Sequence, residues 1–132
     1  MNSSFRKVIP ALLALFVFSA ASCASEKQIS IGMIIKEPSA PYIQAFIKAA
    51  EETAASLGVN IMIRDGEADS IKIMEIIDTF MIQRIDAFIL GGAVDLRTLV
   101  PGIVRLNEAG IPVAALDTSP EGGVVDFFLS FD

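Results

Sequence analysis

The chain has 132 residues, 53% of them apolar, and a formal charge of -6. These values predict one folded domain of modest size and exclude a largely disordered chain. They also exclude nucleic acid as an expected partner, because binding it depends on neutralising phosphates with basic side chains. Histidine is absent and Cys23 is the one cysteine, so we expect no metal, no cofactor and no internal disulfide.

Residues 1–24 are predicted to form a secretory signal peptide. Arg6 and Lys7 precede an apolar run at 8–20, and small residues follow it. A membrane anchor is the alternative, but the run is shorter than the roughly 20 residues that span a bilayer. We therefore expect the folded part to work in the periplasm or at the outer face of a bacterial membrane.

The position of cleavage has two interpretations. The stretch "AASC" resembles a bacterial lipoprotein signal, in which residues 1–22 are removed and Cys23 is lipidated. Ordinary signal peptidase would instead cut after Ala24. If Cys23 is lipidated, its acyl chains hold the mature protein at the membrane.

The mature chain alternates apolar strand patterns with helical patterns. The strands lack polar alternation, which indicates a parallel sheet covered on both faces. The helices repeat apolar residues at i, i+3, i+4 and i+7. In chain order, we expect a strand at 29–35, a helix within 38–58, a strand at 59–65, a helix at 71–84, a strand at 85–90, a helix from Thr98 to Gly110, and strands at 113–116 and 124–130.

Two prolines constrain where helices begin. Pro41 suits a first helical turn, with Ser39 as the expected N-cap. Pro101 fits its helix only if that helix begins near Thr98, because a proline further inside removes a backbone hydrogen bond.

This order predicts an α/β fold, a doubly wound parallel sheet with strand order 2-1-3-4-5. Such sheets bind ligands at the carboxyl ends of their strands. That edge would be formed by residues 36–42, 65–69, 91–95 and 117–120.

The loops at this edge exclude two classes of function. The first turn, "KEPSAPY", has no glycine, whereas a phosphate or dinucleotide site needs glycines there. Thr118 and Ser119 could act as nucleophiles, but the chain has no histidine to activate them. We therefore expect that the protein is not an enzyme.

Five residues at the edge are candidates for binding a ligand: Glu37, Tyr42, Asp95, Asp117 and Thr118. An aromatic ring can cover the C–H side of a sugar, and a carboxylate can accept two hydroxyl hydrogen bonds. Each has a simpler interpretation. Tyr42 could pack over its own helix, Asp117 could form an Asx turn, Asp95 could be an N-cap, and Glu37 a solvated loop charge.

Residues 28–132 resemble the first lobe of the type I periplasmic sugar-binding proteins, the ribose/galactose-binding group. The resemblance lies in "IGMIIKEPSAPYIQAFIKAAEETAASLGVNIMI" and in "NEAGIPVAALDTSP". It implies a non-catalytic protein that captures a small sugar or related polyol for an ABC permease. It further implies that Tyr42 stacks on the sugar and that Asp117 accepts its hydroxyl hydrogen bonds.

The sequence departs from this family at several points. Ala40 and Thr118 stand where the family has Asn and, in ribose binders, Arg, so ribose itself is not expected. Family members also continue into a second lobe, so 28–132 would be a truncated N-terminal lobe whose last strand is an exposed edge for pairing. The alternative function is a sensor or interaction module that has lost its ligand and acts through a partner chain.

Overall fold

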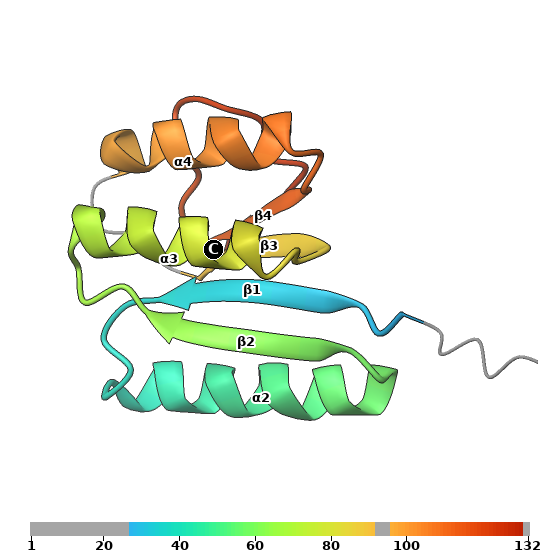
Figure 1. The fold of residues 1–132 in the computed structure, drawn as a ribbon. Coiled ribbons are helices and arrows are strands. Elements are labelled where there is room, and N and C mark those ends of the chain that lie inside the picture. The colour runs from blue at the N-terminus through green and yellow to red at the C-terminus, as the bar shows by residue number, and fades with distance from the viewer. Residues whose placement is uncertain (1–26, 92–95, 131–132) are drawn as a thin grey trace, which may run out of the picture.

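The computed structural model describes residues 27–91 and 96–130, which form five parallel strands and three helices (Figure 1). The elements in chain order are β1 (Ser30–Ile35), α2 (Pro41–Leu57), β2 (Asn60–Asp65), α3 (Ser70–Ile82), β3 (Ala87–Gly91), α4 (Leu96–Glu108), β4 (Val113–Leu116) and β5 (Phe127–Leu129). The sheet order is β2-β1-β3-β4-β5, which confirms the predicted topology.

The sheet is covered differently on its two faces. Figure 1 shows α3 and α4 on one face and α2 alone on the other, under β1 and β2. Neighbouring residues of β1 belong to different clusters, since Ile34 packs with α3 and α4 whereas Met33 and Ile35 pack with α2. This two-sided burial is why the strand sequences lack polar alternation.

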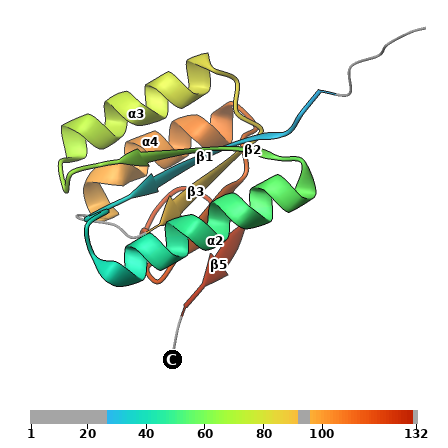
Figure 2. The same ribbon diagram turned by 90° about the horizontal axis from the view of Figure 1, so that it is seen from below.

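The last strand is shorter than predicted, and it begins three residues later. The backbone of Val124 bonds to the side chain of Asn107 on α4 instead of to a strand. Only Phe127–Leu129 then pair with β4, and all three side chains are exposed, Phe127 by 60%. β5 lies at the edge of the sheet, where α2 does not cover it (Figure 2).

The expected starts of two helices were wrong. The N-cap of α2 is Ala40 rather than Ser39, although Pro41 does occupy the first turn. α4 begins at Leu96, so Pro101 lies inside it and not in its first turn. The helix keeps this position because its stripe of Leu99, Ile103 and Leu106 is completely buried. Such burial contributes about 1.5–3 kcal/mol per side chain, comparable to the proline's cost.

Two residues expected in helical apolar stripes are exposed instead. Leu57 is the last residue of α2, and Ile71 is the second residue of α3. Their side chains are 71% and 73% exposed. Both stand at helix ends, where the helix extends past the covered part of the sheet.

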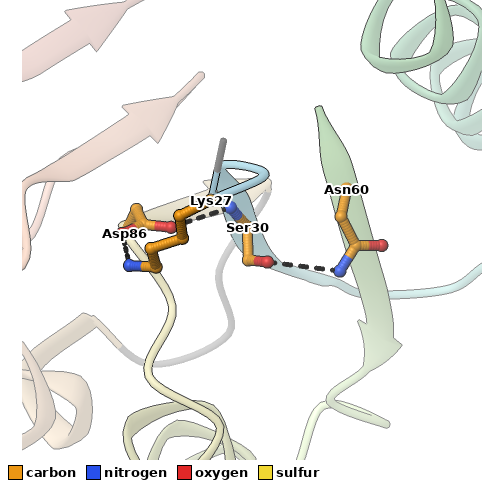
Figure 3. A network of polar contacts seen from close by, with 4 residues as sticks. All are labelled: Lys27, Ser30, Asn60 and Asp86. Carbon is orange, nitrogen blue, oxygen red and sulfur yellow. Dashed lines mark hydrogen bonds and ion pairs between the residues drawn. The ribbon is translucent and has the colours of Figure 1, made fainter. Parts of the chain in front are cut away.

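Carboxylates fix the register at the amino ends of two strands. Asp86, just before β3, donates its N–H to the Ser30 carbonyl at 2.7 Å, and its Oδ2 accepts the Ser30 N–H at 2.9 Å (Figure 3). Asp126, just before β5, makes the same pair of bonds with Val113, both at 2.8 Å. Each side chain thus replaces a carbonyl of the sheet ladder. In the sequence, the only sign of these paired hydrogen bonds is an Asp that stands between an apolar residue and a strand.

Lys27 adds a charge to the first of these carboxylates. Its Nζ lies 2.5 Å from Asp86 Oδ1, and Asn60 extends the network by donating to Ser30 Oγ at 3.4 Å (Figure 3). The hydrogen bond from Lys27, followed by that from the Ser30 N–H, lowers the pKa of Asp86 below its ordinary value of 3.8. At pH values above this ordinary pKa, ionised Asp86 therefore stabilises the fold. This stabilisation is lost as the pH falls through the lowered pKa.

Replacing Lys27 tests this network. In Lys27→Met the pKa of Asp86 should rise, because its strongest partner is lost, and acid unfolding should begin at higher pH. NMR titration of the Asp86 carboxyl carbon measures the first change, and circular dichroism against pH measures the second. Lys48→Met, on the exposed face of α2, is the control and should change neither. An unchanged Asp86 titration in Lys27→Met would contradict the network.

Gly32 leaves room for an aromatic ring. A Cβ at this position of β1 would lie 2.7 Å from Cδ2 of Phe80, which is itself completely buried. We expect Gly32→Ala to lower the free energy of unfolding by about 1–3 kcal/mol through overpacking. Urea denaturation measures this, and adding Phe80→Leu should recover part of the loss. Equal stabilities of wild type and Gly32→Ala would refute the close packing.

Candidate functional site

The carboxyl ends of the strands gather four of the predicted ligand residues at one edge. Glu37 and Tyr42 follow β1, whereas Asp117 and Thr118 follow β4. β3 lies between these two parallel strands, so their ends are about 10 Å apart, two strand spacings. The fifth candidate, Asp95, lies outside the described residues, as does Cys23.

Tyr42 presents its ring to solvent. It is the second residue of α2 and is 68% exposed, so it does not belong to the core. No side chain caps this helix, because the N-cap is Ala40. The first-turn N–H groups of α2 therefore open towards the same edge, where they can donate to water or to a ligand oxygen.

Asp117 sits at the centre of a strained turn. Thr118 donates its N–H to the Leu116 carbonyl at 2.9 Å, and Asp117 between them has a φ of 70°. This is a γ-turn with positive φ, a rare and strained conformation. The backbone groups of Leu116 and Thr118 close this turn without the Asp117 side chain. Its exposed carboxylate is not used in that turn.

Four of the five non-glycine residues with positive φ in the described part of the chain lie at this edge. They are Glu37, Glu67, Ala68 and Asp117, with φ values between 49° and 70°, and Arg84 is the fifth, elsewhere. Each such residue costs on the order of 1–3 kcal/mol, and such residues cluster at functional sites. The sequence placed residues 65–69 at this edge, but it did not indicate that Glu67 and Ala68 have positive φ. The signal that could have revealed them is the short turn between β2 and α3.

Polar contacts at the β2–α3 loop are local. Asp65 Oδ1 accepts the Glu67 N–H at 2.8 Å, and the Glu67 carboxylate forms an ion pair with Lys72. Ser70 and Thr98 join the first turns of α3 and α4 through their hydroxyl oxygens, 2.7 Å apart. The edge thus offers carboxylates, hydroxyls and one exposed aromatic ring, which suit hydrogen bonding to a neutral polyhydroxyl ligand.

In the described part of the chain, the Asp and Glu side chains form no group of three or more that could hold a metal ion. None of its helices combines the length and apolar character needed to cross a membrane. A hollow of about 330 Å³ lies beneath α2, but it is lined by apolar residues such as Ile31, Ala49 and Ile89 and not by the polar edge.

Replacing Asp117 by glycine tests whether the Asp117 carboxylate is needed for the stability of the fold. Glycine adopts positive φ without steric cost, so Asp117→Gly should leave the free energy of unfolding unchanged or raise it by up to about 1 kcal/mol. Asp117→Val should lower it, because a β-branched residue fits this turn worst. Thermal unfolding measures both. Marked destabilisation by Asp117→Gly would show that the carboxylate serves the fold and not a ligand.

Comparison with known proteins relates this edge to a family. A model of the periplasmic binding protein domain matches residues 31–132. The ribose import binding protein of Bacillus subtilis is 24% identical over 140 residues, which cover 96% of this chain and 46% of that protein. The chain therefore spans about half the length of the curated relative it matches.

Solved structures share the fold. The Caulobacter myo-inositol binding protein, bound to myo-inositol, has a TM-score of 0.70 and 23% identity, over 77% of this chain and 35% of that one. An ABC transporter solute-binding protein from Clostridium phytofermentans, with bound β-D-glucose, has a TM-score of 0.72 and 13% identity, over 78% and 32%. These structures share the fold, and the match over residues 31–132 shows that the chain belongs to the periplasmic binding protein domain family.

Proposed function

We propose that this chain is an extracytoplasmic solute-binding lobe that captures a small sugar or related polyol for an ABC importer and catalyses no reaction. The observation that carries the proposal is the strained γ-turn, which presents the Asp117 carboxylate at the edge where Tyr42 exposes its ring. Strained backbone of this kind clusters at functional sites, which supports a ligand at this edge. The sugars and inositol bound by the solved relatives support the same class of ligand.

Each residue has a distinct part in the proposed site. Tyr42 covers the C–H face of the ring, and Asp117 accepts hydrogen bonds from neighbouring hydroxyls. Thr118 adds a hydroxyl beside Asp117, and Glu37 extends the polar rim. A ligand-binding role for Asp95, which lies outside the described residues, is also part of the proposal. Because Tyr42 remains 68% exposed, this lobe covers one side of a ligand, and weak binding is expected.

The proposed location and partners follow from the N-terminal segment and the family. The signal peptide would direct the chain to the periplasm or the outer face of the membrane. Lipidation of Cys23 would hold it there. An ABC permease would then receive the ligand, and the acidic charge of the chain makes nucleic acid an unsuitable partner.

Thermal-shift measurements and calorimetry test the proposal. We expect the melting temperature to rise with at least one neutral ligand among myo-inositol, D-glucose, D-ribose and D-allose. Asp117→Ala should weaken binding by roughly ten- to a hundredfold, since a hydrogen bond to a charged group contributes about 1.5–3 kcal/mol. Tyr42→Ala should also weaken binding, because it removes the ring that covers the C–H face of the ligand. Glu51→Gln, an exposed carboxylate within α2, is the matched control and should bind normally.

Two results would contradict this function. One is a melting temperature that no member of the panel changes, which would favour the ligand-free interaction module. The other is ligand binding that persists unchanged in both Tyr42→Ala and Asp117→Ala.

A further inference from the structure

The orientation of Asp117 depends on the edge strand. Asp117 donates its backbone N–H to the Leu129 carbonyl of β5 at 2.7 Å. Leu129 is also the residue that pairs in register with Leu116, the residue before Asp117. The γ-turn is therefore supported on one side by β4 and on the other by a carbonyl of β5.

Packing alone does little to hold β5 in place. The strand has three residues, it has one neighbour in the sheet, and Phe127, Phe128 and Leu129 are 60%, 47% and 44% exposed. A slip by one residue would move the Leu129 carbonyl by about 3.3 Å, beyond hydrogen-bond distance from Asp117. Something other than burial must fix the register.

Two polar side chains upstream of β5 supply that constraint. Asp126 forms the two-bond ring with Val113 at the start of β4. Asn107 on α4 accepts the Val124 N–H at 2.7 Å and donates to the Val124 carbonyl at 3.0 Å. The chain is thus fixed at two points within the three residues that precede β5.

We propose that Asp126 and Asn107 are positioning residues for the ligand edge, holding β5 in the register that orients the γ-turn at Asp117. They lie at the amino ends of the strands, one sheet length away from any ligand, and act through the backbone. Only the ligand-binding part of this inference rests on the proposed function.

The chain contains its own control for this proposal. Asp86 forms the same two-bond ring with Ser30, at the start of β3. β3 lies between β1 and β4 and is largely buried, and no hydrogen bond of the Asp86 ring leads to the γ-turn. A loss of general stability should follow from removing either ring, whereas a change at Asp117 should follow only from removing the ring of Asp126.

Amide hydrogen exchange by NMR tests the proposal without a ligand. In Asp126→Ala and in Asn107→Ala, the amides of Asp117 and Thr118 should exchange at least about tenfold faster relative to amides of β1, because their support opens locally. Asp126→Asn should restore slow exchange, since its amide oxygen can still accept the Val113 N–H. Asp86→Ala should not accelerate these two amides relative to β1.

Calorimetry with myo-inositol and D-glucose forms the second arm. The affinity for whichever sugar binds the wild type should fall about tenfold in Asp126→Ala and recover in Asp126→Asn. If Asp126→Ala does not fold, Asn107→Ala carries the same test. Unchanged exchange at Asp117 and Thr118 in a folded Asn107→Ala or Asp126→Ala variant would overturn the proposal. Accelerated exchange in a protein that binds no sugar would support the positioning role and contradict the proposed function alone.

Discussion

Parallel pairing of all five strands is the constraint on which the rest of this structure depends. Because every strand runs in the same direction, every loop that follows a strand reaches the same edge. Residues separated by about 75 positions, such as Tyr42 and Asp117, thereby come to the same edge of the sheet. Burial of β1 and β3 on both faces fixes this arrangement, since a slip of either strand would exchange the side chains of the two core clusters.

Aspartate residues have different roles at the amino and carboxyl edges of the sheet. At the amino edge, Asp86 and Asp126 each accept a backbone N–H and replace a carbonyl of the ladder. At the carboxyl edge, Asp117 is held by its backbone alone, and its carboxylate stays exposed. A carboxylate satisfied by the sheet contributes to stability, whereas one left to solvent can exchange water for a ligand hydroxyl. In our proposal, the strained turn at Asp117 is supported by the ordered strand that Asp126 holds, and not by Asp86.

One face of the sheet is covered by a single helix, and this affects both stability and binding. Figure 1 shows α2 under β1 and β2. β5, at the far edge of the sheet (Figure 2), exposes Phe127 and Leu129. The edge strand is therefore held more by polar bonds than by burial, unlike the centre of the sheet. The ligand edge is equally open, with Tyr42 largely exposed, so enclosure of a sugar would need a surface beyond the one this lobe provides.

The sequence by itself determined the alternation of strands and helices, the strand order and the presence of Asp117 at a strand end. These features follow from local periodicity and from the handedness of crossovers, which are encoded in neighbouring residues. The ligand-binding roles of Glu37, Tyr42, Asp95, Asp117 and Thr118 remain predictions. Only the tertiary structure decided that Asp117 has positive φ, that β5 shrinks to three residues and that Pro101 lies inside α4. Each of these results from contacts between distant segments, such as Asn107 with Val124, and no local pattern in the chain records such partners.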